Sequence, residues 1–314
     1  MTEYLIKRLI ALLPVLLIVG LSGFLLINLI PGDPVAVMLG PEATQEDVDR
    51  LRHEMGLDLP LFTQLIRWYS RLFRGDLGYS IFLHRPVLQA IRERLEPTLL
   101  LTFMSLLIST TLGISMGILA AVRRNTRIDQ LVMSLSVLGM SIPSFWLALI
   151  FIQVFAVHIE ILPVAGYTPI SEGIWQTIRS LFLPALTLGF IQSTFIARMT
   201  RSSMLEVLSQ DYIRTAKAKG LTQRKVIYVH ALRNAFIPIA TVLGLVLGSL
   251  MSGAVVVETV FALPGVGQAV LASIARRDYP MVQGILLFIA FIYVFVNFLV
   301  DILYVALDPR VKYV

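Results

Sequence analysis

Cysteine is absent from this sequence, and charged residues are scarce. Without a thiol, the chain forms no disulfide, thiolate metal site, iron–sulfur cluster or cysteine nucleophile. Its four histidines are scattered without a short-spaced ligand pair, so no catalytic metal site is predicted. Charged residues make up only 15% of the 314 residues, whereas a soluble domain carries about a quarter. A water-soluble globular fold is therefore excluded.

Long apolar runs dominate what remains. Apolar residues make up 57% of the chain, and its mean hydropathy is +0.80. An α-helix needs about 20 mainly apolar residues to cross a bilayer core. Such windows occur at 9–30, 98–122, 131–157, 181–196, 235–257 and 281–307. The fourth is the shortest and contains Pro184. We therefore predict an all-α polytopic membrane protein with six transmembrane helices.

The distribution of basic residues predicts the orientation. With both termini in the cytoplasm, 15 of the 26 Lys and Arg residues lie on the inner side, and the two short outer loops keep only Arg179, Arg276 and Arg277. Cytoplasmic loops are enriched in Lys and Arg. This enrichment explains the net charge of +6 without a nucleic-acid partner.

The spans divide the chain into three predicted parts. Residues 1–30 form a retained anchor helix rather than a removed signal peptide, because no small-x-small cleavage pattern follows the apolar run. Residues 31–97 form a small helical extracytoplasmic segment, and residues 98–314 form a five-helix permease core with a cytoplasmic loop at 198–234.

The extracytoplasmic segment carries helix signals. Thr44 is placed to cap a helix that Gly56 ends, a second helix runs from Leu61 to about Gly75, and Pro86 suits the first turn of a third. The segment is interpreted as a packed lid or, as an alternative, a substrate site. Its Trp68 and Tyr69 also suit interfacial anchors.

The inner loop predicts a short amphipathic helix. Ser209 or Asp211 is placed to cap it, and Gly220 to end it, before a second helix starts at Thr222. Tyr212, Ile213 and Ala216 share one apolar face. From periodicity alone, this helix docks either on a partner protein or on anionic lipid headgroups.

This loop also carries a family resemblance. The run from Asp211 to Gly220 reads DYIRTAKAKG, and HALRNA at 230–235 and Ile237-Pro238 follow it. The arrangement resembles the EAA loop of bacterial ABC importer permeases, in the form typical of the dipeptide, oligopeptide and nickel branch. Further similarity runs through nearly the whole chain, with PGDP at 31–34, MGLDLPL at 55–61, GDLG at 75–78, RDYP at 277–280 and LDPR at 307–310.

The resemblance implies the type I ABC importer permease fold and a place in the bacterial cytoplasmic (inner) membrane. It implies three kinds of protein partner: a second homologous permease subunit forming a heterodimer, two cytoplasmic ABC ATPase subunits and an extracytoplasmic substrate-binding protein. The chain has no GxxxxGK[ST] loop, so we expect no enzyme activity and no cofactor in it. ATP and Mg²⁺ would bind the ATPase subunits, which drive alternating access.

In this view the short helix couples the permease to the ATPases. Arg214 stands where the general EAA pattern has glutamate and Arg233 where it has proline, departures that peptide-type permeases share. We therefore assign docking to the helix and its final glycine rather than to one ion pair. The predicted coupling residues are Asp211, Tyr212, Ile213, Arg214, Ala216, Lys217 and Gly220.

The substrate path is predicted from the resemblance, which places the fifth span near the partner permease. Candidate lining residues are Met140, Ser141, Ser249, Met251 and Ser252. Met140, Ser141 and Pro143 form a flexible joint or a tolerated kink. Glycines with GxxxG-like spacing, at 113 and 117 and at 244 and 248, favour ordinary packing within the subunit.

Two acidic residues need separate interpretation. Asp301 lies within the last span, where a proton relay is the functional hypothesis. We favour a structural role, because the Asp-x-x-Tyr spacing to Tyr304 suits a local hydrogen bond. Glu258, just beyond the fifth span, resembles an outer-loop element that touches the binding protein.

Rival functions stay open at this point. An ion-coupled secondary transporter would show an inverted repeat and several buried ionisable groups, and a membrane enzyme would show a polar catalytic cluster. Neither pattern is found in the sequence. Among importer substrates, peptides are favoured, with glutathione and nickel or other metal chelates as alternatives.

Overall fold

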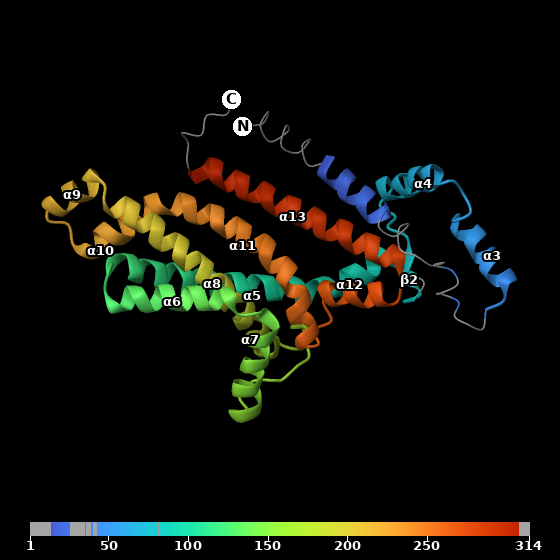
Figure 1. Ribbon diagram of the computed structural model, residues 1–314, viewed down its shortest axis with the longest axis horizontal. Helices are drawn as coiled ribbons and strands as arrows, with labels where there is room; N and C mark the ends of the chain where they lie inside the picture. Colours follow the sequence, from blue (N-terminus) through green and yellow to red (C-terminus); the bar gives the residue numbers. More distant parts are fainter. Residues whose placement is uncertain (1–13, 26–34, 36–38, 40–42, 81, 308–314) are drawn as a thin grey trace. The chain divides into compact units, whose positions relative to one another are not determined.

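The computed structural model describes residues 14–25, 35, 39, 43–80 and 82–307 (Figure 1). The chain divides into two compact units. The outer unit comprises Met1–Glu96 and Gly265–Phe295, and the core unit comprises Pro97–Pro264 and Val296–Val314. Two long helices, α5 (Val87–Val122) and α13 (Tyr279–Leu307), contribute residues to both units.

The all-helical membrane architecture is confirmed. Within the described residues, four helices are long and apolar enough to span a membrane: α5, α8 (Ile174–Leu208), α13 and the run Gln223–Val260. A bent helix pair adds a fifth when it is counted as one span. Of the predicted first span, the structure describes only the helix Pro14–Leu25, so the count of six is not reproduced exactly.

The third predicted span is broken rather than straight. Helix α6 (Arg127–Ser141) and the segment Ser144–His158 meet at 107° (Figure 1). That segment consists of α7 (Ser144–Phe151) and the π-helical turn η1 (Ile152–His158). Pro143 precedes α7, and Ile142 before it has an extended backbone. A residue before proline is pushed out of the helical region by steric clash. The helix is therefore interrupted at this point, and the chain bends sharply.

Helix α5 is longer than predicted. We expected a helix starting at Pro86 and a separate span starting at Thr98. The structure instead has one helix, Val87–Val122, with Pro97 inside it. Pro86 ends a short strand, β2 (Arg85–Pro86), which pairs antiparallel with β1 (Tyr79–Ser80). The hairpin was not predicted. At 1.5 Å per residue the helix is about 54 Å long.

Helix α8 packs closely against its neighbours in the core unit because glycines replace side chains at the contacts. A Cβ atom at Gly113 or Gly117 of α5 would lie 2.6 Å or 2.5 Å from the Cβ of Ile196 or Thr200. A Cβ at Gly139 of α6 would lie 2.5 Å from Thr194 Cγ2. Small residues let membrane helices approach this closely. Packing within the subunit, as predicted, is confirmed for Gly113 and Gly117.

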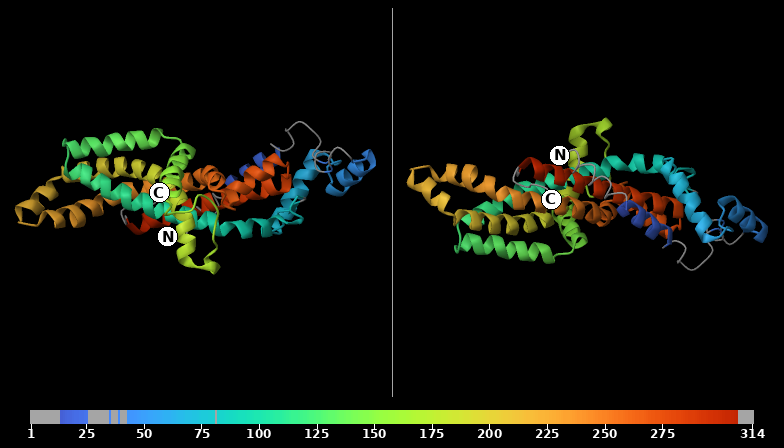
Figure 2. Two further views of the ribbon diagram at one scale, coloured as in Figure 1. Left: turned by 90° about the horizontal axis from the view of Figure 1, so that it is seen from below. Right: turned by 90° about the horizontal axis from the view of Figure 1, so that it is seen from above.

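Helix α11 (Leu232–Val260) pairs with α8. Leu181, Leu188 and Ile196 of α8 share one buried cluster with Val246 and Leu250 of α11. The short helices α9 (Asp211–Ala218) and α10 (Gln223–Lys225) connect the two, and all views place them at one end of the pair (Figures 1 and 2). The turn η3 (Val226–Ala231) is π-helical and leads into α11.

The outer unit contains the helices predicted for residues 44–75. Helix α3 (Gln45–Met55) starts at Thr44, whose hydroxyl accepts from the Asp47 amide, and ends at Gly56 with φ +68°. Helix α4 (Leu61–Phe73) follows. Both predictions are confirmed. Helix α12 (Val266–Ala275) also belongs to this unit, and it shares a buried cluster with the starts of α5 and α13.

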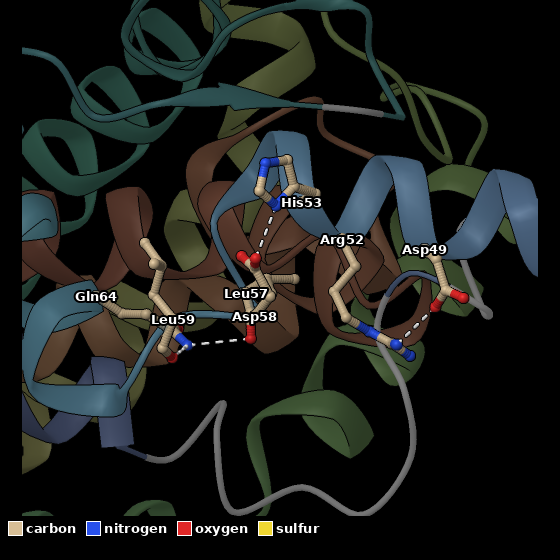
Figure 3. A network of polar contacts seen from close by, with 7 residues as sticks. All are labelled: Asp49, Arg52, His53, Leu57, Asp58, Leu59 and Gln64. Atoms are coloured by element: carbon tan, nitrogen blue, oxygen red, sulfur yellow. Dashed lines mark hydrogen bonds and ion pairs between the residues drawn. The ribbon is translucent and has the colours of Figure 1, made fainter.

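The turn between α3 and α4 is held by polar contacts (Figure 3). His53 Nδ1 lies 2.7 Å from Asp58 Oδ2, and this hydrogen bond lowers the pKa of Asp58. The Gln64 amide nitrogen donates to the carbonyl oxygens of Leu57 and Leu59 at 3.2 and 2.8 Å. These contacts fix the angle at which α4 leaves α3.

Candidate functional site

The inner loop folds into the predicted short helix, with one correction at its start. Helix α9 spans Asp211–Ala218, and its N-cap is Gln210, which makes no side-chain capping bond. We expected Ser209 or Asp211 in that position. The Ser209 hydroxyl instead donates to the Glu206 carbonyl at the end of α8, so it is not available to α9.

The end of α9 agrees with the prediction. Lys219 is the C-cap, and Gly220 follows with φ +77°. A left-handed residue directly after a helix lets the chain turn away, and glycine adopts it without strain. No atom lies within 4 Å of the position of a Cβ at Gly220. The glycine is therefore required for its backbone conformation and not for space.

The apolar face of α9 points into its own subunit. Ile213 is fully buried and Ala216 is 7% exposed, and both belong to a cluster with Ile118 of α5 and Met204 of α8. We expected these two residues to form the surface offered to a partner, and that detail is wrong. They anchor α9 to the long helices instead.

The residues of α9 that face outward are polar or aromatic. Tyr212 is 41% exposed, and its hydroxyl oxygen accepts a hydrogen bond from Asn234 Nδ2 at 3.0 Å. Arg214 and Lys217 are exposed. Arg214 lies 3.4 Å from Asp211, and both side chains are largely in solvent, so this pair adds little stability. The accessible face of α9 therefore carries two basic side chains, one acidic side chain and one tyrosine, so its net charge is positive.

A polar stripe runs along the exposed side of α11. Its members are spaced at three, seven or eight residues, which places them on one helix face, together with the exposed apolar side chains of Leu245 and Val256. We define the α11 polar stripe as Asn234, Thr241, Ser249, Ser252 and Thr259, all exposed. Gln192 of α8 joins it, because its Nε2 donates to Ser249 Oγ at 2.7 Å.

The other candidate lining residues lie in different surroundings. Met251 is 8% exposed and packs inside the subunit, so its side chain offers no free surface. Met140 is 45% exposed at the end of α6, where Arg198 Nη1 donates to its sulfur at 3.5 Å. Ser141 is exposed, and its hydroxyl donates to the Val137 carbonyl. Met140 and Ser141 therefore lie directly before the 107° bend.

An ion pair that was not predicted from the sequence joins α6 to α8. Arg201 donates from Nε and Nη2 to both carboxylate oxygens of Asp129, at 2.6 and 2.8 Å. Asp129 is 3% exposed and also accepts from the Asn125 amide at 2.9 Å. These residues are 72 positions apart. No local pattern could pair them, since Asp129 reads as part of a solvated loop.

The sequence analysis assigned roles to two acidic residues, Glu258 and Asp301. Glu258 is fully buried and accepts a hydrogen bond from Thr98 Oγ1 at 2.6 Å. Our expectation of an outer-loop contact for Glu258 is therefore wrong, because the residue lies within α11 and its buried side chain contacts Thr98 of α5. Asp301 lies in α13, but its side chain is outside the described residues, and its structural role stays a prediction.

Two family models match the chain. The model described as binding-protein-dependent transport system inner membrane component matches residues 113–313. The model for the N-terminal part of such membrane components matches residues 1–102. Together they account for nearly the whole sequence.

Curated relatives match over full length. A protein of Brucella abortus (strain 2308), whose name assigns it provisionally to a peptide transport system as a permease, is 47% identical over 313 residues, with 100% of each chain covered. The glutathione transport system permease of Escherichia coli O6:H1 is 42% identical over the same length, again with 100% of each covered.

A solved structure shares the fold. One chain of the MetNI methionine ABC transporter, in an inward-facing conformation, matches 70% of this chain and 97% of its own length with a TM-score of 0.59. The sequences are 19% identical, so this likeness concerns the fold alone.

Proposed function

The chain belongs to the family of binding-protein-dependent transport system inner membrane components, the permeases of ABC importers, and from this premise we propose that its cargo is a di- or oligopeptide. The proposal is supported by relatives that match over full length and are named for peptide transport, at 47% and 44% identity. The glutathione relative is consistent with it, since glutathione is itself a tripeptide.

The proposed transporter has four kinds of subunit. This chain pairs with a second, homologous permease, and two ATPase subunits bind the cytoplasmic side and hold ATP and Mg²⁺. An extracytoplasmic protein delivers the peptide. Both termini of this chain lie in the cytoplasm, as the Lys and Arg residues around α9 and α10 favour.

We propose that α9 is the element through which the ATPases move this subunit. Ile213 and Ala216 tie it to α5 and α8, so a displacement of α9 acts on both long helices. Tyr212, Arg214 and Lys217 remain accessible to the ATPase. A basic surface complements acidic side chains at the rim of a partner. Alternating access then follows when ATP binding and hydrolysis shift α9 between two positions.

The α11 polar stripe is the proposed wall of the peptide path. Polar side chains within a membrane span normally face a protein interior or a water-filled cavity. The hydroxyls of Thr241, Ser252 and Thr259 donate to carbonyls of their own helix, which leaves their oxygen lone pairs facing outward. A wall without charge suits peptides of any net charge.

Cysteine accessibility tests this wall, because the chain has no native cysteine. In the complete complex, Ser252→Cys should react with a charged methanethiosulfonate reagent, since the reactive thiolate forms in water. The matched control is Leu107→Cys, at an apolar position of α5 that is 56% exposed, which should stay unreactive in lipid. Equal reactivity at both positions would rule the stripe out as a water-lined wall.

Transport competition tests the cargo. The complete complex in proteoliposomes should take up a labelled dipeptide, and unlabelled peptides should compete with it. Nickel ions should not compete. Uptake of nickel without uptake of peptide would overturn the assignment, and the ABC importer framework would stand.

A further inference from the structure

Helix α4, which Figure 1 labels, has a row of large exposed apolar side chains. Phe62, Ile66 and Phe73 are 73%, 54% and 75% exposed. Together with Tyr69 they follow one another at spacings of four, three and four residues, which places all four on one side of the helix. An aligned row of this kind marks a contact with a membrane or a partner.

The remaining sides of α4 differ from this row. Leu65, Trp68 and Leu72 are half-buried and face the rest of the outer unit. Arg67 and Arg71 lie on the side opposite the row, and Arg74 follows the helix directly. Helix α4 contains no acidic residue. It is therefore apolar on one side, and every charged side chain on the other side is cationic.

Contacts tie α4 to the helix Pro14–Leu25, the described part of the predicted first span. The Tyr69 hydroxyl donates to the Leu17 carbonyl at 2.7 Å. The Trp68 ring packs on this helix so closely that a Cβ at Gly20 would lie 3.2 Å from it. The rings of Trp68 and Phe24 have centroids 6.1 Å apart.

The helix Pro14–Leu25 has an exposed apolar surface of its own. Its residues with side chains 37–63% exposed are Val15, Leu17, Ile18, Leu21 and Leu25. The surface of a membrane span that no protein covers is in contact with lipid. Helix α4 is therefore held against an element whose open surface is apolar and suits lipid.

The chemistry of α4 fits a bilayer surface better than a protein. An interfacial helix sinks an uncharged apolar face to the acyl boundary and keeps Lys or Arg at the level of the phosphates, with Trp and Tyr between them. Helix α4 has all three features. An acidic protein would meet the arginine side and leave the phenylalanine row in water.

We propose that α4 is an interfacial membrane helix. Phe62, Ile66 and Phe73 enter the outer leaflet of the bilayer, and Arg67, Arg71 and Arg74 contact lipid phosphates. The segment after the first span then includes an element that rests on the membrane, and α4 holds the first span in place from the side. The proposal does not depend on which substrate is transported.

Spin labels on single cysteines test this placement. The complete complex is reconstituted into vesicles of phosphatidylethanolamine and phosphatidylglycerol, with labels at Ile66→Cys or Phe73→Cys. Glu46→Cys, an exposed position on α3, is the matched control. Collisions with oxygen, which concentrates in lipid, are compared with collisions with a water-soluble nickel chelate.

We expect oxygen to dominate at both α4 positions and the nickel chelate to dominate at Glu46→Cys. Dominance of the nickel chelate at Ile66→Cys and Phe73→Cys would place the row in water and overturn the proposal. Immobile labels that neither reagent reaches would show a protein cover and would overturn it as well. Two label positions are used, so that the test can still be made if one variant fails to fold.

Discussion

Asp129 and Arg201 form a buried ion pair whose loss can be measured. Asp129→Ala leaves the Arg201 guanidinium without its partner between α6 and α8. Breaking such a pair costs about 3 kcal/mol, at the lower end of the usual range because Arg201 is partly exposed. The apparent melting temperature of the purified complex in detergent should fall clearly.

The matched control is an exposed pair on α3. Arg50→Ala removes an ion pair with Asp47 in which both side chains are exposed, and it should leave the melting temperature nearly unchanged. If both substitutions lowered the melting temperature equally, the buried ion pair of Asp129 would not be the stabilising contact that the structure indicates.

A second prediction for a single residue concerns Gly220. With φ +77° and open space around it, valine there would be strained by about 1–2 kcal/mol. Gly220→Val should shift or unravel the end of α9, so that uptake falls while the complex still hydrolyses ATP. Gly220→Asn should retain coupling, because asparagine tolerates the left-handed conformation.

A control separates this effect from backbone strain in general. Gly166 also has positive φ, +97°, and open space around it, but it lies in the loop between η1 and η2. Gly166→Val should leave the ratio of uptake to ATP hydrolysis unchanged. Loss of coupling in both valine variants would remove the special role of Gly220.

The packing of helix α8 requires that its neighbours α5 and α6 approach it closely. In Gly117→Ala, the added methyl would lie 2.7 Å from the Ala197 carbonyl oxygen, which is backbone and cannot move aside. Overpacking of this kind costs about 1–3 kcal/mol. The yield of assembled complex and its melting temperature should both fall.

Gly253→Ala offers a matched comparison on α11. Its added methyl would meet only the end of the Leu188 side chain, at 3.3 Å, which can shift. This variant should assemble normally. If Gly117→Ala were equally well tolerated, the packing of α5 on α8 would be looser than the structure indicates.

The predictability of these elements depends on how local their signals are. Both ends of α3 and the C-terminal end of α9 were predictable, because Thr44, Gly56 and Gly220 act within one turn of the chain. The direction of the α9 apolar face was not predictable. An amphipathic pattern fixes which residues share a face but not what covers them, and Ile213 is buried by residues of α5 and α8.

The angle of the bend at Pro143 and the burial of Glu258 also depend on tertiary structure, so the sequence alone did not predict them. Pro143 permits either a mild kink or a sharp turn, and only the surrounding helices select 107°. Glu258 reads as a loop residue in the sequence. In the structure it belongs to α11, which continues past the predicted end of the span, and its buried side chain accepts a hydrogen bond from Thr98 of α5.

The whole molecule is an importer permease, and we propose that partner subunits supply its energy. The full-length family match defines it as the membrane component of an ABC importer. The proposed route of force enters at α9 and reaches α5 and α8 through the buried cluster around Ile213. The α11 polar stripe would then open to one side of the membrane at a time.

Reconstitution tests this claim most directly. Proteoliposomes are prepared with the complete complex, its extracytoplasmic binding protein and ATP, or with this subunit alone, and accumulation of a labelled dipeptide is measured. The account predicts uptake against a gradient only when the ATPase subunits and ATP are present. Accumulation against a gradient by the isolated subunit would contradict it.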